Sequence, residues 1–332
     1  MKVIIPVAGA GTRLRPHTYT QPKPLIPVGG KPLIASIIDQ LQEEAEIEEY
    51  VLVIGYLGNK IRAYIEELYP HLNITFLYQD ERLGLGHAIW VAADSYADAS
   101  EVLIVLGDTI VEGDLKSLLQ QPHSCLGVKK VDDPREFGVA ETNDNGFITK
   151  VVEKPRIPKS NLALVGIYKI SNVPALQEAL SYIVENKIRT LDEYQLTDAL
   201  MYMIEQGVKF TAFEVDNWYD CGKKDILLAT NAVLLKRRGN ATYTLPNFEN
   251  TIIVQPVSIG KKCTIKNSII GPNVTIGDNS TLNYAIVRNS IIGNYASIEE
   301  AVLHKSIIGS DASIKGLSQS LNIGDNTEID FS

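Results

Sequence analysis

Residues 3–28 read VIIPVAGAGTRLRPHTYTQPKPLIPV, and this stretch decides how the first part of the chain folds. It opens with an apolar run of strand length, which predicts a strand covered on both faces of a sheet. Glycines at 9 and 11 follow, and they would let backbone N–H groups approach a bound anion closely. Because Arg13 and Lys23 flank this loop, the stretch predicts a site for a triphosphate.

Single residues exclude two other phosphate-binding loops. A dinucleotide-binding G-x-G-x-x-G loop would need a third glycine at position 14, where the chain has Leu14. A Walker A loop would need Ser or Thr after Gly30-Lys31, where the chain has Pro32. An ordinary glycine turn stays open as the alternative, although a loop that combines two glycines with Arg13, Lys23 and several prolines is hard to explain as a turn.

Strand and helix patterns alternate along the first two thirds of the chain. Buried strands are predicted at 50–54, 74–78 and 102–106, and amphipathic helices at 34–41, 61–68, 196–203 and 223–238. The alternation predicts an α/β fold with a Rossmann-like, mainly parallel mixed sheet, flanked by helices and joined by right-handed crossovers. Several successive strands are expected within 137–170. We predict one α/β domain over residues 1–238.

A different pattern fills the rest of the chain, where the dipeptide Ile-Gly recurs at 259, 270, 276, 292, 308 and 323. An aliphatic residue every five or six positions suits a three-sided solenoid, with Gly, Asn and Asp accepting positive φ at the corners. The strings IGPNVT and IGDNST resemble the hexapeptide repeat of left-handed β-helices. We predict a C-terminal left-handed parallel β-helix over residues 239–332.

Composition limits the class of protein. The 332 residues carry 31 Lys and Arg against 40 Asp and Glu, a net charge of −9, so no nucleic-acid partner is expected. The three cysteines, Cys125, Cys221 and Cys263, fit neither a disulfide framework nor a cysteine zinc site. No apolar run approaches the roughly 20 residues of a membrane span, and no signal peptide is recognisable. We expect a soluble, cytoplasmic protein with no membrane partner.

The opening loop resembles the signature of the sugar-1-phosphate nucleotidylyltransferases, GxGTRLxP followed by PKPLxPV. The resemblance extends over residues 1–238, and the β-helix is similar to that of the long-form members. It implies a nucleotide-binding loop that wraps a nucleoside triphosphate and contains Gly9, Gly11 and Thr12. It also implies that Arg13 and Lys23 are catalytic, because the matching residues of the family neutralise the reacting phosphates.

Further motifs follow in the order of the family. Gln79 can hydrogen-bond a base edge, and Gly84 in LGLGHAI would leave room for a flat ring, so both are expected to bind the nucleotide. Asp108 ends the strand VLIVLGD at the carboxyl edge of the sheet, and Asp220 lies in WYDCG, which resembles the family's W-x-D-x-G. Two carboxylates that share Mg²⁺ with the phosphates suit that ion, so Mg²⁺ is the expected cofactor. A surface loop for Gln79 and a helix N-cap for either aspartate remain alternatives.

A third group of residues is expected to meet the sugar phosphate, and its assignment depends on the resemblance. Glu153-Lys154-Pro155 matches the family's EKP, where Glu accepts sugar hydroxyls and Lys meets the sugar phosphate. Gly138 matches the glycine beside the sugar. Without the resemblance, Glu153 and Lys154 would be interpreted as a solvated strand end. Thr109 departs from the family, which usually has Asn after the LGD aspartate, and leaves that contact open.

These assignments predict transfer of a nucleotidyl group from a nucleoside triphosphate to a sugar 1-phosphate, with release of pyrophosphate. LGLGHAI resembles pyrimidine-nucleotide members, and the long form with RLRP resembles members that use dTTP and glucose 1-phosphate. The alternatives are a UTP-dependent or other pyrophosphorylase, a two-activity enzyme with an acyltransferase β-helix, and a non-catalytic regulatory homologue. His87 is expected at a helix start near the nucleotide, and His304 is expected to be inert. The flat faces of the β-helix predict a homo-oligomer.

Overall fold

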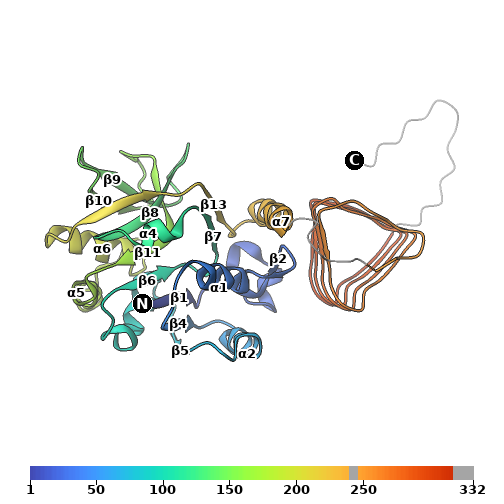
Figure 1. Cartoon of the computed structure of the whole chain (residues 1–332), viewed down its shortest axis with the longest axis horizontal. Coiled ribbons are helices and arrows are strands. Elements are labelled where there is room, and N and C mark those ends of the chain that lie inside the picture. The colour runs from blue at the N-terminus through green and yellow to red at the C-terminus, as the bar shows by residue number, and fades with distance from the viewer. Residues whose placement is uncertain (239–245, 317–332) are drawn as a thin grey trace. The chain divides into compact units, whose positions relative to one another are not determined.

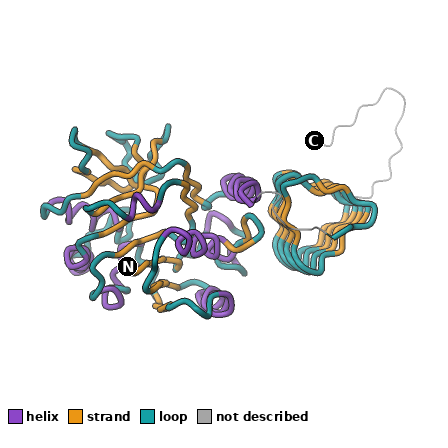
Figure 2. Tube along the Cα trace, in the orientation of Figure 1, coloured by secondary structure: helices purple, strands orange, loops and turns teal. Residues whose placement is uncertain are grey.

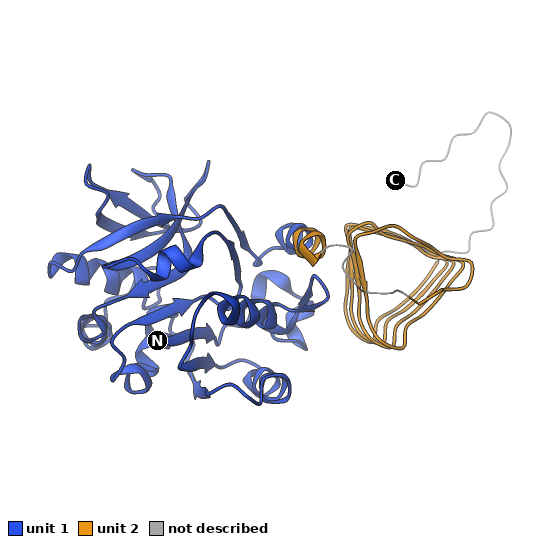
Figure 3. Ribbon diagram, viewed as in Figure 1, with its two compact units in different colours: residues 1–230 blue, residues 231–332 orange. Residues whose placement is uncertain are grey.

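The computed structural model describes residues 1–238 and 246–316 (Figure 1). The chain divides into two compact units, residues 1–230 and 231–332 (Figure 3). The division falls inside helix α7 (Lys224–Arg238), whereas the domain boundary is expected at the end of this helix. The repeat at Ile323 lies outside the described residues.

The first unit is built on a nine-stranded mixed sheet, as predicted (Figure 1). Its strands are β1 (Lys2–Val7), β4 (Glu49–Ile54), β5 (Ile74–Tyr78), β6 (Val102–Val105), β8 (Ser124–Lys130), β9 (Gly138–Thr142), β10 (Ile148–Glu153), β11 (Leu162–Ile170) and β12 (Phe210–Glu214). β1 has parallel neighbours on both sides, β4 and β6, and β5 extends the parallel part. β11 pairs antiparallel with β6, β8 and β9, which makes the sheet mixed. Val3, Ile4 and Ile5 of β1 are fully buried, so both faces of the sheet are covered.

Helices follow the strands and bury their apolar faces. They are α1 (Leu33–Glu44), α2 (Gly58–Leu68), α3 (Leu85–Val91), α4 (Leu115–Leu119), α5 (Val173–Glu185), α6 (Leu196–Glu205) and α7. The predicted helices α1, α2, α6 and α7 are confirmed, and α5 is an addition that begins where the Asn172 side chain accepts a hydrogen bond from Ala175 N. One core joins α3, α5 and α6 to β1 through Ile4 and to β6 through Ile104. Within the described ranges, none of the helices combines the length and apolar character of a membrane span.

The second unit contains a left-handed parallel β-helix, as predicted, and Figure 2 shows its coils stacked one behind another. Over the described residues 246–316 it has three four-stranded parallel sheets. Their strands are β14 (Ile252–Ile253), β17 (Ile269–Ile270), β20 (Ile286–Arg288) and β23 (Val302–His304); β15 (Val257–Ile259), β18 (Val274–Ile276), β21 (Ile291–Ile292) and β24 (Ile307–Ile308); and β16 (Thr264–Lys266), β19 (Thr281–Asn283), β22 (Ser297–Glu299) and β25 (Ser313–Lys315). Ile252 pairs with Ile269, Ile269 with Ile286 and Ile286 with Val302, so one coil takes 17 or 16 residues.

Gly271 of the Ile-Gly repeat has a φ of 107°, as predicted for a corner, but Gly277 serves a different purpose from the one expected. Asn267 occupies a corner with positive φ, as predicted, but Tyr284 and Glu300 occupy equivalent corners with positive φ, so glycine is not required there. A Cβ on Gly277 would instead lie 2.6 Å from the backbone nitrogen of Asn294 in the next coil. Glycine therefore allows the coils to stack at this distance, and the expectation that it serves the corners is wrong for Gly277.

Two outer faces of the β-helix differ in what they expose. On the face made by β15, β18, β21 and β24, Thr275 Oγ1 donates to Asn231 Oδ1 of α7 at 2.7 Å, and both residues are buried. The face made by β14, β17, β20 and β23 carries a row of outward aliphatic side chains in register, here named the aliphatic ridge: Ile252, Ile269, Ile286 and Val302. The two ends of the ridge, Ile252 and Val302, are 61% and 75% exposed. Such a row of apolar side chains on one face is typical of an interaction surface.

Candidate active site

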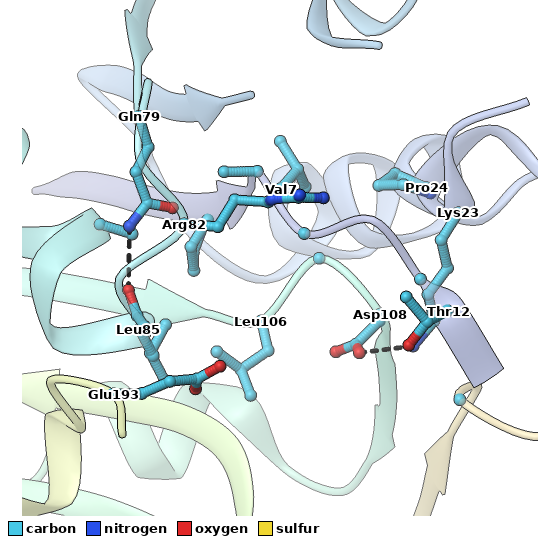
Figure 4. Close-up of a pocket in the computed structure, with 18 of the residues that line it drawn as sticks. Val7, Thr12, Lys23, Pro24, Gln79, Arg82, Leu85, Leu106, Asp108 and Glu193 are labelled. Carbon is cyan, nitrogen blue, oxygen red and sulfur yellow. Dashed lines mark hydrogen bonds and ion pairs between the residues drawn. The ribbon is translucent and has the colours of Figure 1, made fainter. Parts of the chain in front are cut away.

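Two adjoining cavities open beside the carboxyl ends of β1 and β6. The first has a volume of about 400 Å³ (Figure 4), and the second has a volume of about 710 Å³ and is bounded by β9, β10 and β11. Six residues line both cavities: Thr12, Arg13, Leu85, Leu106, Asp108 and Glu193. Every residue predicted to bind nucleotide, sugar phosphate or metal lines at least one of the two cavities. These six shared residues form a common wall, and a phosphate group bound there would be accessible from both cavities.

The glycine loop folds into short turns that bring its two cations to the first cavity. Gly11 has a φ of 61° and precedes a 3-10 turn over Thr12–Leu14. A Cβ on Gly11 would lie 3.0 Å from Lys23 Cβ, whereas nothing lies within 4 Å of a Cβ built on Gly9. Gly11 is thus required for the loop to pack on Lys23, and Gly9 leaves open space beside the cavity. The alternative of an ordinary surface turn does not fit a loop that buries Lys23.

The two aspartates are brought together by a small separate sheet. β7 (Thr109–Glu112) and β13 (Asn217–Asp220) pair antiparallel, which sets Asp220 opposite Thr109, and Cys221 N donates to Asp108 O at 3.0 Å. Asp108 precedes β7 and Asp220 ends β13, so neither position is a helix N-cap. Thr109 Oγ1 lies 3.3 Å from Asp108 Oδ1 and donates to it.

Each aspartate has a cation of the loop beside it. Lys23 Nζ lies 2.5 Å from Asp108 Oδ2, as Figure 4 shows, and Arg13 Nη2 lies 3.7 Å from Asp220 Oδ2. Burial raises the pKa of Asp108, but the charges of Lys23 and Arg13 outweigh burial and hold that pKa below its usual value. Burial and the negative charge of Asp108 raise the pKa of Asp220. The two carboxylates repel each other, and a divalent cation between them would relieve that repulsion.

A divalent cation would find only part of its ligands on the protein. No cluster of three or more His, Cys, Asp or Glu side chains suited to a metal occurs in residues 1–238 and 246–316. The pair Asp108 and Asp220 offers carboxylate oxygens, which Mg²⁺ prefers, and leaves its other positions to water and phosphate oxygens. The donor set therefore fits a metal that arrives with a phosphorylated substrate.

The second cavity collects the residues expected at the sugar. Gly138 begins β9 and pairs with Glu153 at the end of β10. The Glu153 side chain is 12% exposed, accepts a hydrogen bond from Thr197 Oγ1 at 3.2 Å, and lies 3.3 Å from Lys154 Nζ. A Cβ on Gly138 would lie 3.0 Å from Thr197 Cγ2. Glu153 is therefore not a solvated strand end, and Lys154, at a φ of 41°, is held in a strained backbone conformation beside it.

The loop after β5 forms the other end of the first cavity. Gln79 is 5% exposed, which excludes a surface position for its side chain, and its Nε2 donates to Gly84 O at 3.0 Å. A Cβ on Gly84 would lie 2.6 Å from Tyr194 O, so the first reason for glycine there is backbone packing, before any room for a ring. His87 lies in the first turns of α3, as expected, with Nδ1 3.0 Å from Gln79 Nε2.

Two further charged residues line the first cavity without having been predicted. Arg82 stands between Gln79 and the LGLGHAI motif, directly after Asp80 and Glu81, and as the positive residue of that charged stretch it gave no separate signal in the sequence. Glu193 reaches both cavities from a segment with no motif.

His304 is exposed, and the hydrogen-bond partner that the described structure gives it is Asn289 at 3.2 Å. An acyltransferase base would need a group that orients it for proton abstraction, and Asn289 is neutral.

A family model described as nucleotidyl transferase matches residues 2–237. The chain belongs to this family. The match covers the whole sheet and both cavities, and the motifs and the fold agree with a sugar-phosphate nucleotidyltransferase. The resemblance drawn from the glycine loop is confirmed.

Relatives and solved structures extend this assignment. The chain is 32% identical over 326 residues to the low-salt glycan biosynthesis nucleotidyltransferase Agl11 of Haloferax volcanii, which covers 88% of this chain and 87% of the relative. It is 30% identical over 321 residues to a glucose-1-phosphate thymidylyltransferase of Streptomyces antibioticus, covering 88% and 86%. A UDP-glucose pyrophosphorylase complexed with UDP-glucose aligns with a TM-score of 0.63 at 27% identity, over 71% of this chain and 99% of that one.

The contact of Gly84 with Tyr194 generates a stability prediction. Gly84→Ala should lower the free energy of unfolding by more than Gly146→Ala, measured by urea denaturation. Both glycines have positive φ, 109° and 78°, which costs alanine about 1–2 kcal/mol. Nothing lies within 4 Å of a Cβ on Gly146, whereas the Cβ on Gly84 would overlap a backbone oxygen, which adds about 1–3 kcal/mol. Equal losses for the two variants would show that this contact does not constrain the loop.

Proposed function

We propose that the chain transfers the thymidylyl group of dTTP to glucose 1-phosphate, giving dTDP-glucose and pyrophosphate. The observation that carries the transfer is the common wall of the two cavities, where Arg13 and Asp108 face both. Similarity to the thymidylyltransferase of Streptomyces antibioticus over 88% of this chain supports the choice of dTTP and glucose 1-phosphate. A second candidate is UTP as the nucleotide, which the structural likeness to a UDP-glucose pyrophosphorylase supports.

The reaction is a single in-line displacement. An oxygen of the sugar 1-phosphate attacks the α-phosphorus, the bond from that phosphorus to the bridging oxygen of the β-phosphate breaks, and pyrophosphate leaves with the electron pair. The attacking phosphate is already ionised, so no side-chain nucleophile or base is needed. Catalysis then consists of holding two polyanions at reacting distance and offsetting the charge that develops between them.

Different residues of the two cavities contact different parts of the two substrates in this proposal. In this proposal Arg13 binds the β- and γ-phosphates together with the loop of Gly9, Gly11 and Thr12, and Gln79 with Gly84 holds the base. Lys23 binds the α-phosphate, and its Nζ lies 2.5 Å from Asp108 Oδ2. At the other cavity, Glu153 accepts sugar hydroxyls, Gly138 lies beside the sugar, and Lys154 meets the sugar phosphate.

Mg²⁺ is the proposed metal, held by Asp108 and Asp220. When bound, it would supply positive charge that stabilises the negative charge of the transition state on the phosphate oxygens. The two carboxylates repel each other across β7 and β13, and Lys23 and Arg13 offset only part of that repulsion. Each carboxylate has its own cation beside it, Lys23 at Asp108 and Arg13 at Asp220.

A pyrophosphate-release assay tests the substrate assignment. dTTP, UTP, GTP and ATP would each be combined with glucose 1-phosphate and with mannose 1-phosphate, and we expect the largest kcat/KM for dTTP with glucose 1-phosphate. A larger kcat/KM for UTP would replace the first candidate by the second. Absence of release from every combination would contradict the proposed activity and favour a non-catalytic regulatory role.

Arg13→Ala should lower kcat by about 10²–10³, because a cation aimed at developing charge acts mainly in the transition state. The KM for the nucleotide should change much less. Steady-state kinetics would separate the two constants, with Arg62→Ala as the control, since Arg62 is an exposed arginine paired with Glu66 on α2. Near-normal turnover of Arg13→Ala would remove Arg13 from the catalytic residues.

Asp220→Asn should abolish Mg²⁺-dependent turnover at saturating substrate without unfolding the chain, because it removes one carboxylate charge at constant volume. Asp108→Asn should do the same, and high Mg²⁺ should restore part of the activity of either variant. The matched control is Asp216→Asn, an exposed aspartate outside both cavities of the described structure. Titration calorimetry that found unchanged Mg²⁺ affinity in the nucleotide complexes of both variants would refute the two-aspartate site.

We further propose that the β-helix assembles the chain into a homo-oligomer through its aliphatic ridge, with no chemistry of its own. Val302→Glu should reduce the molecular mass measured by light scattering and leave the nucleotide preference unchanged. Thr281→Glu, an exposed position on another face, is the control. A wild-type chain that is monomeric at micromolar concentration would contradict the proposal.

A further inference from the structure

The side chain of Gln79 has a defined orientation in the wall of the first cavity. Its amide nitrogen Nε2 lies 3.0 Å from the carbonyl oxygen of Gly84 and 3.0 Å from Nδ1 of His87. An amide nitrogen carries two hydrogens, so it can donate to both groups at once. In Figure 4 the dashed line at the Gln79 amide nitrogen marks the hydrogen bond to Gly84, and the amide oxygen points in another direction.

The two partners together determine which end of the amide faces them. A carbonyl oxygen such as that of Gly84 only accepts hydrogen bonds, so it requires the nitrogen. The second hydrogen needs another acceptor, and Nδ1 of His87 is one only when the ring is neutral with its proton on the opposite nitrogen. The amide oxygen is then left as an acceptor toward the cavity.

The surroundings of His87 favour that neutral ring. Burial lowers the pKa of His87 and the nearby charge of Arg189 lowers it further, against the opposing effect of Glu81. The ring of Tyr194 stacks on the imidazole, with centroids 6.2 Å apart and planes 25° apart. His87 therefore has a constrained position and surroundings that favour the neutral ring, whose Nδ1 accepts a hydrogen bond when the proton is on Nε2.

His87 itself is absent from the lining of both cavities in the part of the chain that the structure describes, and its side chain is connected to the first cavity by the contact with Gln79. We propose that His87 is a positioning residue that holds the Gln79 amide oxygen toward the nucleobase and thereby selects bases with a ring N–H. This inference rests on the proposed function, because it takes the first cavity as the nucleotide site.

The selection follows from the donors and acceptors of the bases. Thymine and uracil carry a hydrogen on N3, which can donate to the Gln79 oxygen. Cytosine has a lone pair at N3, and two acceptors facing each other in a buried site are left without a hydrogen bond. The arrangement therefore distinguishes dTTP and UTP from cytidine nucleotides, while it does not distinguish thymine from uracil.

The test compares the binding of dTTP and dCTP by titration calorimetry, with the full chain and Mg²⁺ present. His87→Phe keeps an aromatic ring but removes the acceptor, and the ratio of the two dissociation constants should fall by roughly 10- to 100-fold. His87→Asn places an oxygen near the position of Nδ1 and should restore most of the ratio. If His87 had a merely structural role, His87→Phe would weaken the binding of dTTP and dCTP alike, and His87→Asn would not restore the ratio.

A second pair of variants tests whether His87 acts through Gln79. Gln79→Leu removes the amide and should abolish the preference, and adding His87→Phe to it should lower the ratio no further. An additional loss in the double variant, or an unchanged ratio in His87→Phe, would overturn the inference. Thermal melting of every variant identifies any that fail to fold, and His87→Asn then supplies the comparison.

Binding also separates this inference from the proposed reaction. A chain that releases no pyrophosphate with any sugar 1-phosphate, yet shows the expected change of the dTTP to dCTP ratio, would refute the reaction and retain the role of His87. A chain that transfers the nucleotide but binds dCTP as tightly as dTTP would do the opposite. Failure of the wild-type chain to bind either nucleotide would overturn both.

Discussion

The pairing of β7 with β13 is the constraint on which the rest of the site depends. These strands belong to segments far apart in the sequence, and their antiparallel register sets Asp220 opposite Thr109. The hydrogen bond from Cys221 N to Asp108 O extends that pairing to the aspartate itself. A shift by one residue would turn Asp220 to the other face of the ribbon and separate the two carboxylates. The proximity of Asp108 and Asp220 therefore depends on this register.

Placing two carboxylates together in a partly buried site is unfavourable, and the glycine loop offsets it. Lys23 is buried against Asp108 and Arg13 reaches Asp220, so each negative charge has a positive neighbour from the same loop. A Cβ on Gly222 would lie 2.5 Å from Arg13 Nη2, which shows how closely the guanidinium is accommodated. The cations and carboxylates are therefore held in place by contacts within the protein, which is the condition for electrostatic catalysis.

Much of this arrangement could be predicted from local sequence, because apolar runs and helical spacing report burial directly. The strands around β1, the loop at Arg13 and Lys23, and the β-helix are of this kind. What could not be predicted depends on contacts between distant segments: the register of β13 on β7, the packing of Gly84 on Tyr194, and the place of Glu193 in both cavities. The purpose of Gly277 was missed for the same reason, since this glycine is constrained by a residue one coil away.

The coil length of 17 or 16 residues has a consequence for how such a chain can change over time. Within residues 246–316, the strands of each coil pair with the strands of the adjacent coils, so a duplication or loss of one whole coil preserves the inward and outward phase of every other. An insertion of any other length inside a strand would turn inward side chains outward, or would have to be accommodated as a loop at a corner. The β-helix can therefore lengthen or shorten in whole steps, and the distance between its two ends can be adjusted without redesigning its interior.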